Sequence, residues 1–427
     1  MQPIRTPIRR AIAAGFSAVC VAAAMTSCGS SGGGGTGSTA ADHADTLKGK
    51  PVTVGLIVMQ SGVAASAQEN QWVVGTRAAA AYINNKLGGF GGRPLKIDLC
   101  DSKSTSAGAL TCANKLAADK VDFVSGFALG IGANALPIFA KAGIPVHSVP
   151  ISPQEYSSPD SFPYGGGSFS EYPANAAYAT AKLGAKKGVL VVSDLGDSSA
   201  VVNSMNVFFR RAGGSVTAIT VPATTADLSP QVAEAIKAKP DAIFTALSGV
   251  QDATLYEQLE KQGFSPRNII AQASAVDVPN FFAKVSPKTA VEGSLYGDIF
   301  VSFDDTAQPD VATYRTAMKT YEKDDGRTVL GQWSFSTIMT NYAIGKKQGF
   351  ATFSGASLIK ALNTETVPVF MSYQYNRAAA PKGAPAVGNP YVVFVRYQGG
   401  KVVNQPGGWV NGVTGAAAAF DPSITTG

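Results

Sequence analysis

The chain has 427 residues, of which 46 are glycine and only two are histidine. It carries 35 basic and 29 acidic residues, and three of the arginines lie in the first ten positions, so the remainder has 32 basic against 29 acidic residues. So small an excess, without a Lys/Arg cluster or an aromatic and basic platform, argues against a nucleic-acid partner. Beyond the N-terminal region, no segment approaches the run of about 18 apolar residues that a membrane span requires.

The N-terminus has the organisation of an export signal. Arg5, Arg9 and Arg10 form a positive region, and the apolar stretch 11–25 that follows is too short for a transmembrane anchor. It ends in Met-Thr-Ser-Cys at 25–28, which resembles a bacterial lipobox, where the cysteine is diacylated and becomes the first mature residue. We therefore expect residues 1–27 to be a lipoprotein signal peptide and Cys28 to be lipidated. The alternative is an ordinary secretory signal cleaved near the same place.

Residues 28–50 begin with a glycine- and serine-rich run and are predicted to be a flexible tether. A tether behind a lipid anchor indicates a globular domain held at the extracytoplasmic face of a bacterial cell membrane. One acyl chain binds a membrane only marginally, so stable attachment needs the several chains of a bacterial lipoprotein.

The remaining chain, roughly 375 residues, is longer than one hydrophobic core usually holds, so two lobes are expected. Short apolar runs alternate with amphipathic stretches, which is typical of α/β layering. The first block predicts strands at 52–58, 95–99, 121–124 and from 144, with a helix after each of the first three. After a Pro/Ser/Gly-rich passage at 150–167, strands are predicted at 188–192, 215–221, 240–244 and 268–271, with helices at 199–211, 232–238 and 255–262.

The last third of the chain is predicted to be less regular. Loop passages near 165–172 and 295–300 join the two blocks, and helices follow near 311–323 and 334–347. The tail from 367 to 403 has strand character and is interrupted by a loop at 377–389.

Cys100 and Cys112 are the two cysteines outside the N-terminal region. In an exported chain, two cysteines with eleven residues between them suggest one disulfide. Closing so small a loop would stabilise the fold by about 3 kcal/mol in the chain-entropy model. The alternative is a pair of buried free thiols, and no histidine lies nearby to favour a metal site.

The motifs do not favour an enzyme. A Ser-His-Asp arrangement would have to use His147, and the Gly-x-Ser-x-Gly string at 29–33 lies in the tether, where no nucleophile elbow can form. The chain has no P-loop, His-Glu-x-x-His or Cys-x-x-Cys motif. We therefore expect no catalytic residue, no metal and no cofactor, and we interpret His147 as a hydrogen-bonded histidine at a strand end.

Gly130 and Gly132 lie between a predicted strand and a predicted helix. Glycine there lets a ligand approach the backbone closely, and a helix N-terminus offers unpaired N–H groups to an anion. Ligands of open α/β sheets lie outside the carboxyl ends of the strands, which is where these residues are expected. The alternative is a permissive strand-to-helix turn.

Short segments in a fixed order carry the most specific signal. They lie at 55–57, 80–85, 88–95, 116–126, 143–146, 238–244, 262–264 and 291–293. This series resembles the type I periplasmic binding proteins, and within them the branched-chain amino acid or leucine-binding-protein-like family of ABC transporter receptors. The resemblance extends from about 52 to 365.

The resemblance implies an α/β fold of two Rossmann-like lobes joined by three crossovers, with the ligand cleft between them. Lobe one would be 51–170 plus 300–366, lobe two 171–299 plus 367–415, and 416–427 a tail. It also implies a substrate-binding protein that captures a small-molecule solute by closure and presents it to ABC permease and ATPase subunits. The alternative is a ligand-sensing module for a membrane receptor or kinase, since fold does not determine function.

In the family's amino-acid-binding members, a short set of residues holds the carboxylate and ammonium of the ligand. The matching positions retain Pro150 and Ser152 in kind, but Gly130 replaces a carboxylate-binding serine and Ser274 replaces the ammonium-binding acid. Three tyrosines are replaced by Ala67, Ser198 and Ser248. The clamp has mostly small residues here, which predicts weak binding of leucine, isoleucine or valine. Candidates to line the remaining space are Gln60, Ser61, Gln68, Gln251 and Trp333.

Overall fold

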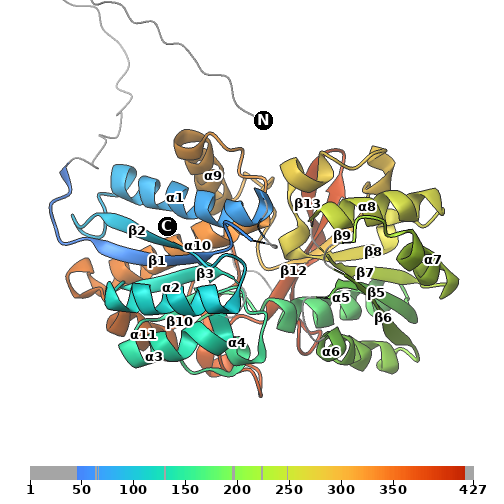
Figure 1. The fold of residues 1–427 in the computed structure, drawn as a ribbon, viewed down its shortest axis with the longest axis horizontal. Helices are drawn as coiled ribbons and strands as arrows, with labels where there is room; N and C mark the ends of the chain where they lie inside the picture. The colour runs from blue at the N-terminus through green and yellow to red at the C-terminus, as the bar shows by residue number, and fades with distance from the viewer. Residues whose placement is uncertain are drawn as a thin grey trace, which may run out of the picture. The chain divides into compact units, whose positions relative to one another are not determined.

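The computed structural model describes residues 46–418, with gaps at 63–64, 66, 129–130, 195–197, 223–224 and 248. The predicted signal peptide and the predicted lipidation residue Cys28 lie outside the described residues. Figure 1 shows the arrangement of the helices and strands.

The first sheet has four parallel strands in the order β2-β1-β3-β4. Alternate side chains of the central strand β1 face opposite sides: Leu56 packs with Trp72, whereas Ile57 packs with Leu116. Burial on both faces explains why this strand is apolar almost throughout. The strands are β1 (Val52–Val58), β2 (Leu95–Asp101), β3 (Phe123–Phe127) and β4 (Val146–Ser148).

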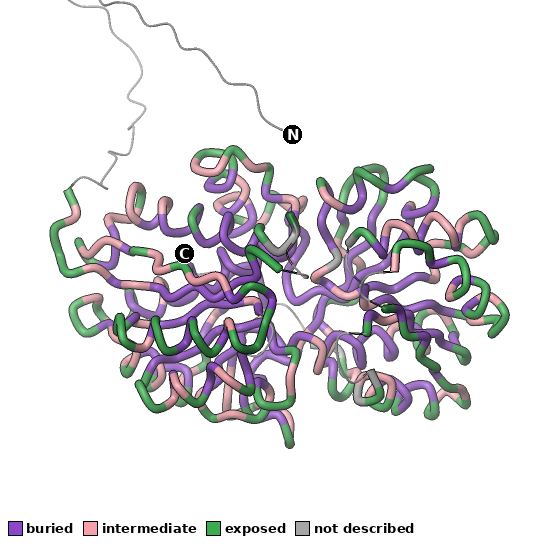
Figure 2. Tube along the Cα trace, in the orientation of Figure 1, coloured by how far each residue is buried: buried purple, intermediate pink, exposed green. Residues whose placement is uncertain are grey.

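Two layers of helices cover this sheet. On one face, α1 (Ala67–Lys86) packs along α10 (Val329–Gln348). On the other face lie α2 (Ser106–Ala118) and α3 (Leu136–Ala142), with a π-helical turn, η2 (Ile131–Ala135), before α3. Figure 2 shows that buried residues follow the strands and most of α10.

The second sheet has eight strands in the order β14-β13-β12-β9-β8-β7-β5-β6. The five strands from β5 to β9 are parallel, and β12 pairs antiparallel with β9 at Val393 and Asp298. Leu190 and Phe244 face α5 and α6, whereas Val189 and Ile243 face α8. The strands are β5 (Lys187–Ser193), β6 (Ser215–Val221), β7 (Ala242–Ala246), β8 (Ile269–Gln272), β9 (Leu295–Asp298), β12 (Tyr391–Gln398), β13 (Lys401–Asn411) and β14 (Ala417–Ala418).

The helices of this second half are α5 (Ser168–Lys182), α6 (Ser198–Arg211), α7 (Ser229–Lys237) and α8 (Gly249–Lys261). Beyond β9 come α9 (Pro309–Ala317) and α11 (Gly355–Thr364), on either side of α10 in the chain. A two-stranded sheet of β10 (Thr366–Val367) and β11 (Tyr375–Asn376) contacts α11, and the chain enters the eight-stranded sheet only at Tyr391. The predicted second lobe resumed at 367, before this point.

Several elements differ from the predictions, among them the short α4 (Pro153–Ser157) in the Pro/Ser/Gly-rich passage. The helices α5 and α11 were not predicted, and the strand β9 lies where a loop was expected. Pro173 within α5 and the glycines before it disguised the helix. Gly297 made this segment resemble a loop in the sequence, but in the structure it lets Asn175 pack closely, since a Cβ there would lie 2.2 Å from the side-chain oxygen of Asn175.

The predicted disulfide is present in the structure. Cys100 in β2 is bonded to Cys112 in α2, with their Cα atoms 5.6 Å apart. It fastens α2 to an edge strand of the first sheet, since β2 pairs only with β1 there. Among the described residues, no helix combines the length and the apolar character needed to cross a membrane.

Candidate functional site

Gln60 and Ser61 lie on the exposed loop that follows β1. Asp101, the last residue of β2, holds this loop: its carboxylate accepts hydrogen bonds from the Gln60 N–H at 3.0 Å and from the Ser61 hydroxyl at 2.6 Å. Slight burial opposes ionisation of Asp101, but these bonds and one from the N–H of Lys103 lower its pKa. The structure therefore places both predicted residues at the carboxyl edge of the first sheet.

Ser152 and Gly132 meet at the same edge. Ser152 is the N-cap of α4 (Pro153–Ser157), and a Cβ on Gly132 would lie 2.1 Å from its Oγ, so glycine allows this close approach. The buried carboxylate of Glu155 accepts hydrogen bonds from the hydroxyls of Ser152 at 2.8 Å and of Ser148 at 2.6 Å. Burial raises the pKa of Glu155, against the effect of these bonds. The loop after β4 is thus internally hydrogen-bonded.

Pro150 precedes that loop and is buried. Its carbonyl oxygen would lie 2.6 Å from a Cβ on Gly167, which has a φ of +48°. The chain can pass this close to Pro150 only because residue 167 is glycine. Pro150 therefore positions the start of α5.

On the second sheet, Gln251 occupies the first turn of α8. Its side-chain amide donates to the carbonyls of Pro222 and Thr225, both at 3.1 Å, and accepts from the Ser193 hydroxyl at 3.1 Å. Gln251 is buried, so it ties the segments after β5 and β6 together rather than presenting its amide on the surface.

Ser274 and Trp333 lie on adjoining elements. Ser274 is half-buried in a 3-10 turn, η4 (Ala273–Ala275), which contacts α10. Just after that turn, the carbonyl of Val276 accepts a hydrogen bond of 3.0 Å from the N–H of Val329, the first residue of α10. The loop after β8 is thereby attached to the helix that carries Trp333.

Trp333 itself belongs to a buried aromatic cluster. Its ring centroid lies 6.2 Å from that of Trp72 and 5.8 Å from that of Phe300, and only 1% of Trp333 is exposed. Trp72 also stacks on the half-buried Phe127, at the end of β3, and donates its indole N–H to the Ser125 hydroxyl. Trp333 is therefore a core residue behind this edge.

For four other predicted site residues, the structure does not describe the side chain. Gly130 and Ser248 lie outside the described residues. Gln68 and Ser198 are described only as backbone, in the first turns of α1 and α6.

The chain passes between the two sheets three times, at 149–167, 299–308 and 377–390. Asn389, fully buried, connects these crossovers: its side-chain N–H groups donate to the carbonyls of Tyr164 and Tyr373 and to the Ser372 hydroxyl, at 3.0 to 3.2 Å. Ser372 in turn donates to the carbonyl of Ile299. The Asn389 amide and the Ser372 hydroxyl thus link all three connections, and no pattern in the sequence indicates this role.

Two buried carboxyl groups lie beside these crossovers. Burial raises the pKa of Glu171, in the first turn of α5, to about 7, and its carboxyl accepts the Ala273 N–H at 3.2 Å. Burial, with added repulsion from Glu171, raises the pKa of Asp298, which accepts the Phe300 N–H at 3.0 Å. No Lys, Arg or His in the described part of the chain forms an ion pair with either group.

A third buried carboxyl, Asp252, lies in the first turn of α8. Burial raises its pKa to about 8, and neither carboxyl oxygen has a partner in hydrogen-bonding geometry, although the Thr245 hydroxyl is near enough to oppose the rise. The second sheet thus carries, at its carboxyl edge, several acids whose pKa values are raised by burial.

His147 is a buried residue within the strand β4. Its Nδ1 lies 2.8 Å from the carbonyl of Phe162, its ring stacks on Tyr164, and burial lowers its pKa to about 4. Among the described residues, no group of three or more His, Cys, Asp or Glu side chains is arranged to hold a metal ion.

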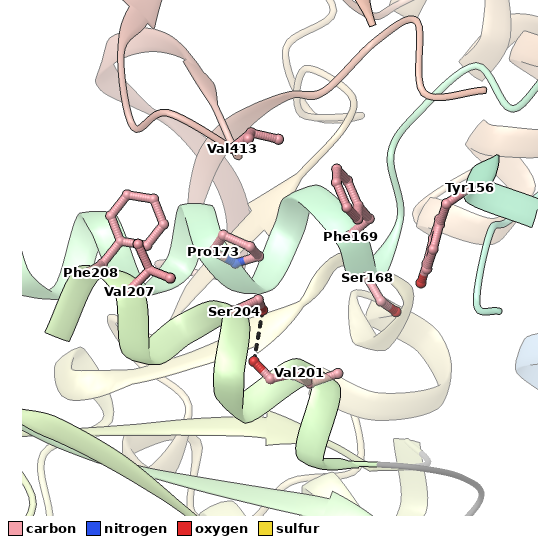
Figure 3. A pocket seen from close by; sticks show the side chains of 9 residues that line it. All are labelled: Tyr156, Ser168, Phe169, Pro173, Val201, Ser204, Val207, Phe208 and Val413. Atoms are coloured by element: carbon pink, nitrogen blue, oxygen red, sulfur yellow. Dashed lines mark hydrogen bonds between the residues drawn. The ribbon is translucent and has the colours of Figure 1, made fainter. Parts of the chain in front are cut away.

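A cavity of about 240 Å³ lies between α5 and α6 (Figure 3). None of the predicted site residues lines it. Its wall is mostly apolar and is completed by Tyr156 of α4 and by the turn between β13 and β14. The lining residues are Tyr156, Ser168, Phe169, Pro173, Val201, Ser204, Val207, Phe208 and Val413. The sequence offered one signal for it, the apolar residues of α6 spaced at helical intervals.

Comparison with known sequences identifies the architecture. The sequence profile of the periplasmic binding protein family matches residues 51–401. The chain belongs to the periplasmic binding protein family. Its members bind solutes and are not enzymes, and the predicted type I fold is confirmed. Comparison with curated proteins finds no match.

Solved structures with the same fold include proteins with different ligands in their names. A leucine-binding protein from Thermotoga maritima is 20% identical, with 84% of this chain and 99% of that chain covered and a TM-score of 0.67. A solute-binding protein from R. palustris in complex with 4-hydroxybenzoate is 20% identical (83% and 96% covered, TM-score 0.67). A fatty acid ABC transporter substrate-binding protein from Thermomonospora curvata is 17% identical (84% and 92% covered, TM-score 0.71).

Proposed function

We propose that this binding protein is the lipid-anchored, extracytoplasmic receptor of an ABC importer and that it captures a small organic solute by closure of two lobes. The observation that carries the proposal is the threefold passage of the chain between two sheets whose parallel strands end in loops rich in polar residues. Such an arrangement favours a cleft between lobes, because ligands bind outside the carboxyl ends of parallel strands.

The two lobes would each contain one sheet. The first would comprise the four-stranded sheet with α1 to α3 and α9 to α11, and the second the eight-stranded sheet with α5 to α8. The contacts of β10 and β11 with α11 favour assigning residues up to about 390 to the first lobe, since Tyr391 is the first residue of β12. Solute contacts to both lobes would stabilise the closed state, which the membrane permease then recognises.

The solute is proposed to differ from a free branched-chain amino acid. The matched position of the ammonium-binding acid is Ser274, and Gln251, a candidate for the remaining space, is committed to internal hydrogen bonds. The name of one protein with this fold refers to fatty acids and that of another to 4-hydroxybenzoate, which supports a wide range of organic solutes for the fold.

Mass spectrometry of protein purified under native conditions tests the proposal. A small molecule released on denaturation should rebind to refolded, ligand-free protein with one-to-one stoichiometry in calorimetry. Deleting the gene should then abolish uptake of that molecule by cells. Normal uptake together with loss of a transcriptional response would favour the sensing alternative. Failure of the refolded protein to bind any solute, from a native extract or from a metabolite panel, would contradict solute capture.

A further inference from the structure

The cavity between α5 and α6 has one polar end and an apolar body. At the polar end the hydroxyls of Tyr156 and Ser168 face each other (Figure 3). Burial, with repulsion from nearby carboxylates, raises the pKa of Tyr156, so the phenol stays protonated and can donate a hydrogen bond. The third polar side chain, Ser204, already donates to the carbonyl of Val201 at 2.7 Å. The hydroxyl proton of Ser204 is therefore committed, and the end with the hydroxyls of Tyr156 and Ser168 is the more polar one.

Helical spacing aligns the apolar body. Val201, Ser204 and Val207 are three residues apart on α6, so they share one face, and Phe169 and Pro173 are four apart on α5. Residues of both faces line the cavity (Figure 3).

The turn after β13 closes the far end. A Cβ on Gly415 would lie 3.1 Å from the ring of Phe208 and 3.5 Å from the Cβ of Ala177, so this turn packs against both α6 and α5. Val413 of the same turn lines the cavity. Two of the few large apolar side chains exposed in the described residues, Val207 at 46% and Val413 at 37%, border this one space.

We propose that this cavity is a second binding site, separate from the solute cleft, for a small phenol-like molecule. The hydroxyl of the ligand faces Tyr156 and Ser168, and its ring lies between Phe169, Pro173 and Val207. Aromatic and proline side chains suit a flat ring, whose edge and face both make favourable contacts.

The volume fits a single ring. An apolar protein cavity of about 150 Å³ holds benzene, so about 240 Å³ accommodates a substituted ring with a few more heavy atoms. Tyr156 lies four residues beyond Ser152 on α4, so an occupant contacts both the helix that follows the first sheet and α6 of the second. Binding here therefore touches both halves of the molecule.

Ligand-detected NMR titration with p-cresol tests the site. Val207→Asp places a charge on the apolar wall, and we expect it to weaken p-cresol binding at least about tenfold, because a carboxylate loses hydration beside a bound ring. Val403→Asp is the matched control, since Val403 is similarly exposed at 39% and lies on β13 outside the cavity. Ser204→Leu, which fills the cavity with apolar atoms, should give the same loss as Val207→Asp. No p-cresol binding to the natural chain, or equal binding to all variants, would overturn the proposal.

The polar end is tested with a matched pair of probes. p-Cresol and toluene differ by one hydroxyl, so the natural chain should prefer p-cresol. Tyr156→Phe removes the facing hydroxyl and should reduce that preference by about tenfold, the effect of roughly one hydrogen bond, without changing the affinity for toluene. An unchanged preference would overturn the assignment of the polar end.

Discussion

Replacing Glu171 by glutamine should stabilise the protein at pH 8 and leave its stability at pH 4.5 nearly unchanged. Burial raises the pKa of Glu171 from 4.5 to about 7. Between these values the unfolded chain ionises the group while the folded protein keeps it protonated. The native state therefore binds more protons, and its stability falls as the pH rises through this interval.

The size of the stability change follows from the pKa shift of Glu171. Each pKa unit corresponds to about 1.36 kcal/mol, so a rise from 4.5 to about 7 corresponds to a loss of about 3 kcal/mol at pH 8. Glutamine keeps an oxygen that can accept the Ala273 N–H and removes the ionisation. Urea unfolding followed by tryptophan fluorescence at pH 4.5, 6 and 8 measures the difference in unfolding free energy. Parallel pH profiles for the natural chain and Glu171→Gln would refute the reasoning.

Asp227→Asn is a control, because the pKa of Asp227 is shifted in the opposite direction to that of Glu171. Asp227 is fully exposed, and hydrogen bonds from the hydroxyl and N–H of Ser229 lower its pKa. The native state therefore favours the ionised form of Asp227. Any stabilisation that this carboxylate contributes is present above the ordinary pKa of an aspartate and is lost as the pH falls. This variant should not gain stability at pH 8, whereas Glu171→Gln should.

Four further predictions concern the anchor, the disulfide, the solute and the crossovers. Cys28→Ala should move the protein from the detergent phase to the aqueous phase; retention in detergent would show that the anchor is elsewhere. Thiol labelling of denatured, unreduced mature protein should modify neither Cys100 nor Cys112, and stoichiometric labelling of both would contradict the bridge. Loss of a charge partner typically costs about 2–5 kcal/mol, so calorimetry on ligand-free protein should show weak or no binding of leucine, isoleucine and valine; submicromolar affinity would be inconsistent with Ser274 in place of the acid. Asn389→Ala should lower the unfolding free energy by about 3 kcal/mol, because two donors and one acceptor are lost in a buried site; the exposed Asn114→Ala is the control, and equal effects would disprove the role of Asn389.

Strong local patterns made most of the fold predictable. The strand predicted at 52–58 coincides with β1, and that at 215–221 with β6, because their apolar side chains recur at strand spacing or without interruption. The elements that were missed depend on distant partners. β9 is a strand because Gly297 packs against Asn175 and pairs with β8 and β12, none of which a local pattern records.

The candidate site was less predictable for the same reason. Gln251 was predicted from its position to line the ligand space. Its amide instead donates to the carbonyls of Pro222 and Thr225, which lie more than twenty residues away in the sequence. Glu171 and Asn389 passed unnoticed because a single polar residue does not indicate burial. Their roles arise from contacts across separations of about one hundred to more than two hundred residues, between Glu171 and Ala273 and between Asn389 and Tyr164.

The shared hydrogen bonds of Asn389 have a mechanical consequence. If the three crossover segments were independent, each could bend in a different direction, and the two sheets could shear and twist relative to each other. Because the hydrogen bonds of Asn389 and Ser372 link the three segments, we expect the segments to move together, so that the relative motion of the two sheets has essentially one coordinate. A single pair of fluorophores, one attached at the exposed Val250 of α8 and the other at the exposed Leu110 of α2, should then follow the whole motion. In Asn389→Ala protein, the same pair should report a broader distribution of distances.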